Sequence, residues 1–509
     1  MEQDNSVKSR RIAKNTLMLY VRMFFMMFLG LFTSRIVLSA LGENDFGVYN
    51  VVGGVVAMFT IISGALNSAV SRFITFEMGK GEDAQLNKVY STAVTIQMIL
   101  ALIVVILAEP VGIWFIGNEM TIDPSRIPAA KWVLHFSLLS FVINLMSVPQ
   151  MASITAHEKM SAYAYIGILD GLLRFGVALV IAVSGHDRLI LYAFLMMCSV
   201  LIVRMAYGLY CRRHFPECRY RPVWDLPLIK EMFSFAGWNF IGVTSGVLRD
   251  HGGNILVNLF FGTAVNAARG VAIQLNGAVQ GFVTNFMTAV NPQITKSYAS
   301  GDREYMLSLV GKSSRMSFYL LFVIALPLIF NTEYLLGLWL KDVPEGSASF
   351  ARLFLIFALS ESLSNPLITA QLATGNIRRY QIIVGGLIML NLPASYVLLL
   401  LGAPAESTVT VAIVISQLCL AARLVLLKDM VGLSPGLYVR KVYLNVLAVT
   451  SAALLLPLVS EFFITDGLAG FCISVVVCII SAGLSILFVG CSSKERQEMK
   501  ELLLRRMKR

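Results

Sequence analysis

Long apolar stretches recur along nearly the whole chain, and they constrain its fold more than any other feature. Each is about 20 residues long, which is the length that a helix needs to cross the hydrocarbon core of a bilayer. The run 99–108 reads ILALIVVILA and does not alternate in polarity, as a strand of a membrane barrel would. Because a helix satisfies its own backbone hydrogen bonds in lipid, we predict an all-α polytopic membrane protein.

The charge content supports this prediction. Only 14% of the 509 residues are charged, whereas 57% are apolar. Soluble domains carry roughly 25% charged residues, because a folded surface must be hydrated. Lipid must therefore solvate much of this chain, and we expect a transporter and no enzyme.

Hydropathy predicts fourteen membrane-spanning helices, and the basic residues orient them. Of the 41 lysines and arginines, 30 lie in segments on one predicted side, 4 in loops or edges on the other, and 7 inside spans. Because Lys and Arg accumulate in cytoplasmic loops, both termini are predicted to be cytoplasmic, and the net charge of +11 needs no nucleic-acid partner. The predicted spans are 15–40, 46–71, 86–108, 131–155, 161–184, 188–210, 231–261, 264–290, 307–330, 349–373, 380–401, 408–427, 441–461 and 467–490.

An internal repeat is visible at a shift of about 220 residues. Three segments of the first part return later in the same order, which indicates duplication of a six-helix unit. An even number of spans per unit keeps both copies in the same orientation. The matched segments are 41–52 with 261–272, 72–86 with 292–306 and 148–159 with 365–376, and they align Gly42 with Gly262, Gly81 with Gly301 and Pro149 with Pro366.

The repeat predicts the domain organisation. We expect two six-helix lobes, 1–210 and 231–430, joined by a basic cytoplasmic linker at 211–230. Two additional transmembrane helices follow at 431–490, and a basic cytoplasmic tail at 491–509. Two such lobes are expected to enclose a central cavity, which is where transporters bind substrate.

Charged residues inside the predicted spans are candidates for function. Each costs at least ~2.5–3.5 kcal/mol in the hydrocarbon region, so each needs a reason. Interior arginines outnumber interior acids, and a guanidinium binds phosphate oxygens in a bidentate manner, which suits an anionic ligand. The predicted substrate-binding residues are Arg22, Arg35, Arg249, Arg269, Asn254 and Asn258.

Several of these charges also have a structural explanation. Asp170 and Arg174 are four residues apart on one helix face and could simply neutralise each other. Arg22 and Arg35 could reach lipid headgroups from the two ends of the first span. Glu361 is a candidate site for a proton or a sodium ion.

Arg249 and Asp250 are harder to explain by packing, because they lie near the middle of the span 231–261. We predict that they act as a functional pair. Gly252 and Gly253 follow shortly after, and we expect them to loosen the helix and permit a bend. Asp250, Asp170, Arg174 and Glu361 are thus predicted to form coupling or structural ion pairs.

Amide side chains recur through the seventh and eighth predicted spans. They could join helices by hydrogen bonds. They could equally line a wetted wall that recognises sugar hydroxyls. They are Asn239, Asn254, Asn258, Asn266, Gln274, Asn276, Gln280 and Asn285.

Five passages resemble bacterial polysaccharide-biosynthesis flippases of the Wzx or oligosaccharide-flippase type. The passages are SALGENDFGVYNVVGGVVAMF, SRFITFEMGKG, RDHGGNILVNLFFG, ARGVA and NPQITKSYASGD, and the resemblance covers roughly residues 12–430. This group belongs to the superfamily of the MATE exporters and the lipid II flippase. The resemblance implies two six-helix lobes around a cationic cavity, with Arg22, Arg35, Arg249 and Arg269 on the helices that form its wall.

The resemblance also implies the substrate and the setting. Undecaprenyl-pyrophosphate-linked oligosaccharides would move across the bacterial inner membrane by alternating access, for surface polysaccharide, lipopolysaccharide or O-antigen biosynthesis. A glycan polymerase or glycosyltransferases are expected partners. No phosphate loop precedes Gly311, so we expect no cofactor, and an H⁺ or Na⁺ gradient is the expected energy source. We expect no metal site. The alternative is a MATE-like ion-coupled exporter of drugs or other small molecules.

Overall fold

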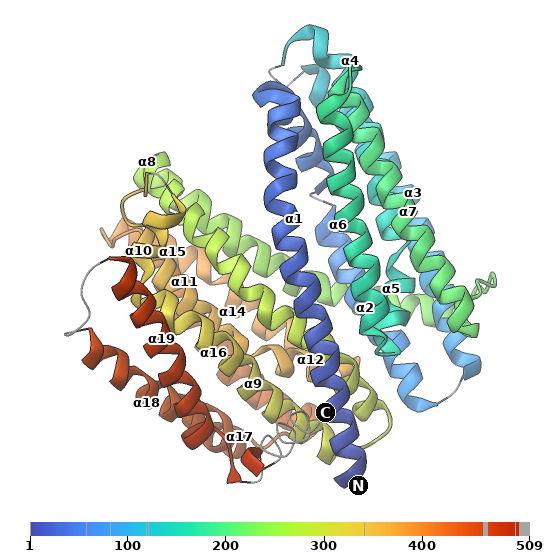
Figure 1. The fold of residues 1–509 in the computed structure, drawn as a ribbon. Coiled ribbons are helices and arrows are strands. Elements are labelled where there is room, and N and C mark those ends of the chain that lie inside the picture. The colour runs from blue at the N-terminus through green and yellow to red at the C-terminus, as the bar shows by residue number, and fades with distance from the viewer. Residues whose placement is uncertain are drawn as a thin grey trace, which may run out of the picture. The chain divides into compact units, whose positions relative to one another are not determined.

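The computed structural model describes residues 2–57, 59–81, 83–118, 120, 122–340, 342–461, 467–493 and 495–497. Helices dominate these residues, and no strand occurs among them (Figure 1). Twelve helices within this part of the chain are long and apolar enough to cross a membrane. The protein is therefore the all-α polytopic membrane protein that its sequence predicts, but the count of fourteen spans is not confirmed.

Two very long helices account for much of the difference in count. Helix α8 (Leu226–Ala299) has 74 residues. At ~1.5 Å per residue it would extend about 110 Å if straight, far beyond the ~30 Å of the hydrocarbon core. Its backbone is non-helical at Gly262, so the predicted spans 231–261 and 264–290 are two parts of one kinked helix. The predicted span 46–71 is likewise no single helix, because it is divided between the end of α1 (Glu2–Ala57) and α2 (Thr60–Lys80).

The repeated glycines have matching backbone conformations. Gly42, which kinks α1, has φ 76° and ψ 169°, and Gly262 has φ 80° and ψ −171°. This region is essentially restricted to glycine, because a Cβ atom would clash there. The second matched pair, Gly81 and Gly301, has φ 78° and 80°. The internal repeat thus appears in the backbone as well as in the sequence.

The repeated prolines also occupy equivalent places. Pro149 and Pro366 each lie in the first turn of a short helix, where the missing N–H of proline is tolerated. The predicted spans 131–155 and 349–373 are therefore both broken. The breaks separate α4 (Ile127–Leu145) from α5 (Val148–Ala156) and α11 (Ser347–Ser362) from α12 (Asn365–Thr374).

The chain divides into two compact units, to which α8 contributes different parts. Unit 1 comprises Met1–Val243 and Thr288–Gly301, and unit 2 comprises Thr244–Met287 and Asp302–Arg509. The first and last parts of α8 therefore belong to unit 1, and its middle part belongs to unit 2.

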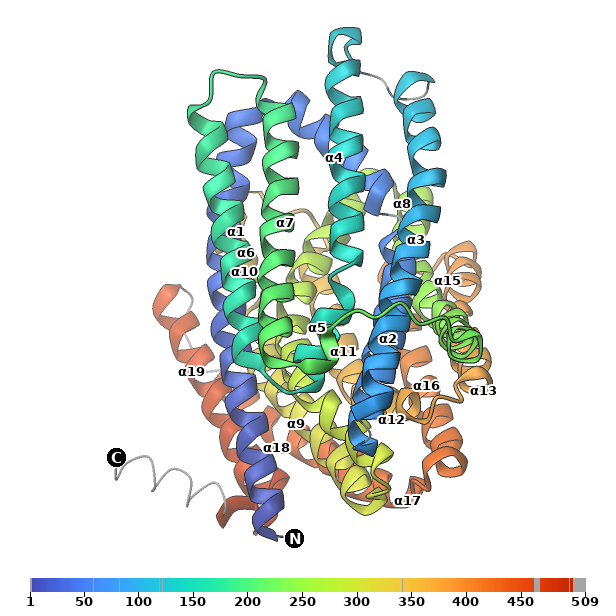
Figure 2. The ribbon, with the colours of Figure 1, turned by 90° about the vertical axis from the view of Figure 1, so that its right-hand side faces the viewer.

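In unit 1, helices α1, α6 and α7 lie side by side, and α2 packs against α3 and α5 (Figure 2). The apolar core includes Val37, Ala178 and Ile181. The remaining elements of this unit are α3 (Asp83–Asn118), η1 (Pro124–Arg126), α6 (Met160–Val183), α7 (Arg188–His214) and η2 (Pro216–Cys218).

The segment between α7 and α8 lies within the predicted linker 211–230. The side-chain amide of Asn87 on α3 donates hydrogen bonds to the backbone carbonyls of Glu217 and Arg219, at 2.7 and 2.8 Å. These contacts hold the segment against unit 1. Its role as the boundary between two lobes stays a prediction.

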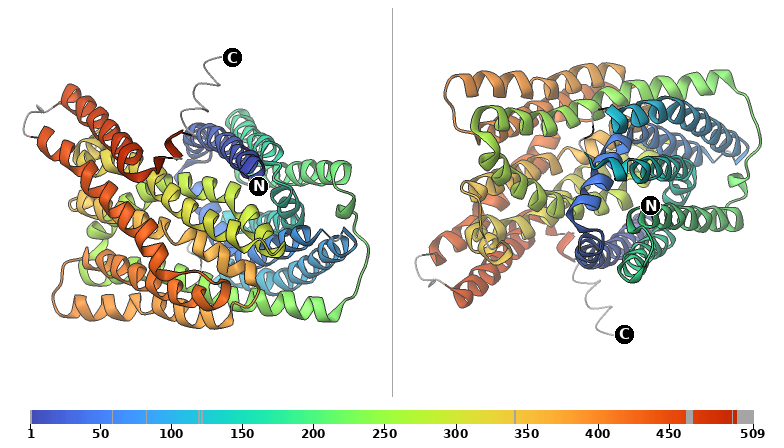
Figure 3. Two further views of the ribbon diagram at one scale, coloured as in Figure 1. Left: turned by 90° about the horizontal axis from the view of Figure 1, so that it is seen from below. Right: turned by 90° about the horizontal axis from the view of Figure 1, so that it is seen from above.

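In unit 2, α11 packs against α9 and α16, and α18 packs against α19; the last two are drawn in red in Figures 1 and 3. The apolar core includes Val257 and Ala268 of α8 together with Phe350. Three short segments, η3, η4 and η5, are π-helical. The elements are α9 (Arg303–Phe330), α10 (Thr332–Trp339), α13 (Arg378–Tyr380), η3 (Gln381–Gly385), α14 (Gly386–Met389), α15 (Asn391–Leu400), α16 (Ser407–Val431), α17 (Pro435–Tyr438), η4 (Val439–Tyr443), α18 (Leu444–Ser460), α19 (Leu468–Ser485) and η5 (Ile486–Gly490).

Candidate functional site

Arg249 and Asp250 form a direct ion pair in unit 2. The Nε atom of Arg249 lies 2.8 Å from Oδ1 of Asp250, and its Nη2 atom lies 3.4 Å from Oδ2. The guanidinium also lies over the ring of Phe357, 4.8 Å from its centroid. The Arg249 side chain is 18% exposed and that of Asp250 is 60% exposed. The carboxylate is thus far more accessible than the guanidinium.

Arg269 is the most deeply buried of the predicted binding residues, at 4% exposure. Its Nη1 atom donates a hydrogen bond to the hydroxyl of Thr408 at 3.2 Å, and its guanidinium lies 5.1 Å from the ring centroid of Phe354. Its Nε atom is buried and has no hydrogen-bond partner among the described residues. A buried charge of this kind is costly unless an anion or strong acceptors compensate it. Asp250 acts on Arg269 electrostatically, although no ion pair joins them in the described part of the chain.

The backbone of α8 stays helical at Gly252 and Gly253, so the expected loosening is not seen as a break in the helix. The helix is continuous through them, and its only non-helical residue among those described is Gly262. A Cβ atom on Gly253 would lie 2.6 Å from Nη2 of Arg269, and one on Gly252 would lie 2.4 Å from a methyl group of Leu392. These glycines therefore make room for neighbouring side chains, one of which is a binding candidate.

Arg423 is a further buried arginine that sequence reasoning did not select. It is 3% exposed on α16 and donates hydrogen bonds to the hydroxyls of Tyr380, at 2.9 Å, and Ser364, at 2.8 Å. Glu361 acts electrostatically on both Arg423 and Arg249. Its position inside the predicted span 408–427 is the sequence signal that could have identified it.

We call Arg249, Arg269 and Arg423, with Asp250 and Glu361, the arginine cluster of unit 2. With three arginines and two acidic residues, the cluster has a formal excess of one positive charge. Only the Arg249–Asp250 pair is in direct contact. The cluster can therefore supply charge-assisted hydrogen bonds to an anion, above all from the buried Arg269.

The amide side chains of α8 fall into two groups. Asn239 donates a hydrogen bond to the carbonyl of Ala65 on α2, at 3.4 Å, and so joins two helices. In contrast, the side-chain oxygens of Asn254, Asn266 and Asn276 are buried and have no hydrogen-bond partner in the part of the chain that the structure describes. Asn258, the other predicted binding amide, is exposed. The second group fits a polar wall better than a helix joint.

The predicted residues of unit 1 lie in different surroundings. Arg22 packs on α6, with its guanidinium 4.6 Å from the ring centroid of Tyr163 and in close contact with Gly167, where a Cβ atom would lie 2.1 Å from Nε. That Nε atom is buried without a hydrogen-bond partner. Arg35 is exposed. Arg22 is thus held inside unit 1, whereas Arg35 is accessible.

Asp170 and Arg174 form an ion pair along one turn of α6. Nε of Arg174 lies 3.0 Å from Oδ1 of Asp170. Tyr207 lies within electrostatic range of both Asp170 and Arg22. This pair neutralises itself, so Arg22 is the better candidate for binding an anion in unit 1.

Sequence comparison places these features in a family. A family model described as "Polysaccharide biosynthesis protein" matches residues 12–298. The chain is also 19% identical over 296 residues to an uncharacterized membrane protein, EpsK, of Bacillus subtilis (strain 168). That match covers 58% of this chain and 58% of EpsK, so it spans less than two thirds of the relative's length.

Comparison with solved structures identifies the fold. A MATE protein in complex with MaD3S has a TM-score of 0.73 and 12% identity, and the match covers 83% of this chain and 97% of that one. A MOP superfamily transporter from Pyrococcus furiosus Vc1 (DSM3638), described with a binding pocket of reverse polarity, has a TM-score of 0.70 and 9% identity, with coverage of 83% and 96%. The fold is that of the MATE transporters.

Proposed function

This chain belongs to the polysaccharide biosynthesis protein family, and on that premise we propose that it is a membrane flippase or exporter of polyprenyl-pyrophosphate-linked oligosaccharide. The family and the fold support a membrane flippase or exporter. The identity of the substrate goes beyond what the family and the fold support, and we infer it from the chemistry of the buried side chains.

Arg269 carries the proposal. It is a guanidinium at 4% exposure that contacts a hydroxyl and an aromatic ring, and no described residue provides an acceptor for its Nε atom. A pyrophosphate would supply strong acceptors and negative charge, and hydrogen bonds between charged groups contribute roughly 1.5–3 kcal/mol each. A cationic drug would gain nothing at this position, because two cations repel each other.

The other parts of the substrate match other features. The unpartnered amide oxygens of Asn254, Asn266 and Asn276 can accept hydrogen bonds from sugar hydroxyls. The polyprenyl tail would remain in lipid while the head group crosses. We include in the proposal alternating access, a bacterial inner-membrane location with both termini cytoplasmic, and Glu361 as the group that would respond to an H⁺ or Na⁺ gradient.

Binding of the lipid carrier tests the substrate class directly. Purified protein in detergent is titrated with undecaprenyl pyrophosphate, and with undecaprenol as the phosphate-free control. We expect thermal stabilisation by the pyrophosphate only. Arg269→Ala should weaken this binding by roughly 10- to 150-fold, which corresponds to the loss of one charge-assisted contact. Arg379→Ala is the matched control, because that arginine is 75% exposed and lies outside the cluster.

Export in cells provides the second readout. In a strain that lacks its own copy of this protein, Arg269→Ala and Arg249→Ala should abolish display of surface glycan at normal membrane abundance, whereas Arg379→Ala should restore it. Normal glycan display by both cluster variants would refute the assignment.

The MATE fold itself favours one alternative, an ion-coupled exporter of small cationic molecules. This function predicts drug resistance in a susceptible host and an essential carboxylate. Resistance that depends on Glu361 and survives Arg269→Ala would favour the alternative over the flippase.

A further inference from the structure

A pocket with several charged lining residues lies in unit 2 and shares no residue with the arginine cluster. It has a volume of about 460 Å³ and is lined by α9, η4, the start of α18 and the chain from the end of η5 onward. Its charged lining residues are Arg315, Arg440, Lys441 and Glu495. We call it the basic pocket.

Two π-helical turns shape the basic pocket. Arg440 and Lys441 belong to η4, and Val489 and Gly490 belong to η5. Such turns are rare and frequently mark functional sites. The finding of two at one pocket singles it out from the rest of the unit.

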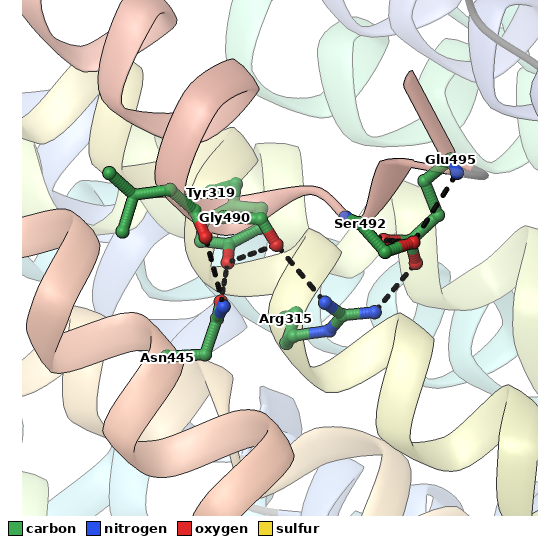
Figure 4. Close-up of polar contacts among 7 residues, drawn as sticks. Arg315, Tyr319, Asn445, Gly490, Ser492 and Glu495 are labelled. Carbon is green, nitrogen blue, oxygen red and sulfur yellow. Dashed lines mark hydrogen bonds and ion pairs between the residues drawn. The ribbon is translucent and has the colours of Figure 1, made fainter. Parts of the chain in front are cut away.

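The backbone carbonyls at the end of η5 accept hydrogen bonds from side chains (Figure 4). The Nδ2 atom of Asn445 donates to the carbonyl of Val489 at 3.2 Å, and Nη1 of Arg315 donates to that of Gly490 at 3.1 Å. The hydroxyl of Tyr319 donates to Asn445 and, at 3.4 Å, to Gly490. A Cβ atom at position 490 would lie 2.8 Å from that hydroxyl. The wall of the pocket is therefore built by contacts that only glycine permits there.

Glu495, the carboxylate of the pocket, is fully engaged. Its Oε1 atom accepts from Nη2 of Arg315 at 2.6 Å, and its Oε2 atom accepts from the backbone N–H and the hydroxyl of Ser492 at 2.8 and 2.9 Å (Figure 4). Burial would raise the pKa of Glu495, but the Ser492 N–H, the Arg315 charge and the Ser492 hydroxyl outweigh it and hold that pKa below its ordinary value. Glu495 and Arg315 thus neutralise each other.

Among the described residues, Arg440 and Lys441 are the cations at the pocket that no carboxylate neutralises. Both are exposed, and no ion pair joins either of them to a carboxylate in the part of the chain that the structure describes. Large apolar side chains are exposed on the segments that line the pocket: Leu444, directly after η4, at 52%, and Phe488, in η5, at 66%. A cationic pocket bordered by exposed apolar side chains is complementary to an amphiphile with an anionic head group.

We propose that the basic pocket binds the phosphate group of an anionic membrane phospholipid, whose acyl chains lie along α18 and η5. Basic pockets at the membrane boundary recognise phospholipid head groups through charge and hydrogen bonds. A bound lipid would add contacts between η4 and η5, the two segments that line the pocket. The inference does not depend on the proposed transport function.

Lipid titration of the full-length protein in detergent tests the proposal. The probes are a short-chain phosphatidylglycerol, the matching phosphatidylcholine and inorganic phosphate, with thermal unfolding and native mass spectrometry as readouts. We expect phosphatidylglycerol to bind and to raise the unfolding temperature, and its affinity to fall as salt screens the cations. Arg440→Gln with Lys441→Gln should weaken this binding roughly 30-fold, since each cation near a membrane surface contributes about a factor of five.

Two further variants distinguish a specific pocket from general charge. Arg379→Gln with Lys428→Gln removes the same charge from exposed positions outside the pocket and should bind phosphatidylglycerol like the wild type. Arg440→Lys with Lys441→Arg preserves the charge and should retain most of the binding. Equal binding by the Arg440/Lys441 glutamine variant and the wild type would overturn the proposal. Stabilisation by inorganic phosphate that equals the effect of the lipid would overturn the lipid as the source of the phosphate.

Discussion

Replacement of Glu158 offers a quantitative test of the packing in unit 1. Its side chain is 2% exposed and accepts contacts from Nζ of Lys296 at 2.7 Å, Nε2 of Gln293 at 2.6 Å and Nε of Arg11 at 3.3 Å. It therefore ties α1, the turn between α5 and α6, and the last part of α8. Its backbone has φ 58°, the only positive value of a non-glycine residue among those described.

Two opposing effects determine the expected magnitude. Removal of one partner from a buried ion pair costs about 3–5 kcal/mol, and the half-exposed Arg11 adds little. The positive φ angle costs a non-glycine residue about 1–2 kcal/mol. We therefore expect Glu158→Ala to lower the free energy of unfolding by about 3–5 kcal/mol, and Glu158→Gly to lower it by about 1 kcal/mol less, because glycine relieves the strain.

The repeat supplies an internal control for this argument. Gly375 corresponds to Glu158 in the second copy and has φ 76°, and as a glycine it has no side chain that could form the ion pairs of Glu158. Gly375→Ala should cost about 1–3 kcal/mol from backbone strain alone. Lys159→Ala, at an exposed neighbouring position, should change the free energy by less than about 0.5 kcal/mol.

Equilibrium unfolding in mixed micelles, followed by far-ultraviolet circular dichroism, measures these differences. The order of stability should be wild type, then Glu158→Gly, then Glu158→Ala. If the free energy of unfolding of Glu158→Ala lay within about 1 kcal/mol of the wild-type value, the buried contacts of Glu158 would not stabilise unit 1 as argued. If Glu158→Ala were more stable than Glu158→Gly, the positive φ angle at residue 158 would not be a source of strain.

Two further predictions concern the glycines at the helix kinks and the pH dependence of stability. Gly42→Ala and Gly262→Ala should each destabilise the protein by about 1–3 kcal/mol in the same unfolding assay, whereas Gly270→Ala, in a helical and open position, should be neutral or stabilising. Because the pKa of Glu495 is lowered in the folded state, its stabilising contact with Arg315 is fully present above the unfolded carboxyl pKa of about 4.3 and is lost as the pH falls through the folded pKa. The stability difference between the wild type and Glu495→Gln should therefore shrink as the pH is lowered from neutral toward acid, and a difference that grows would refute this reasoning.

Local sequence patterns were sufficient for the membrane assignment and the repeat. Hydropathy predicts helices because each apolar segment meets the bilayer through its own residues and satisfies its own hydrogen bonds. The repeated glycines were visible for a similar reason, since Gly42 and Gly262 serve a backbone conformation that other residues avoid. The span count was less accessible, because hydropathy does not show that a helix continues through the break at Gly262.

The partners and the burial of individual charged side chains depended on tertiary structure. Arg249 and Asp250 are neighbours in sequence, and their pairing followed from the pattern. Arg269 instead meets Thr408, 139 residues away, and its guanidinium lies against Gly253. Arg423 lies inside the predicted span 408–427, yet only the structure shows that it is buried.

The sequence by itself thus determined that this chain forms apolar helices in a membrane, in two related copies, with an excess of interior arginine. Only the tertiary structure decided which arginines have carboxylate partners and which, like Arg269, are buried without one. The physical reason is the distance along the chain over which each effect acts. The hydropathy and backbone preferences of a helix are properties of adjacent residues, whereas the cost of a buried charge is set by atoms that folding brings from distant parts of the chain.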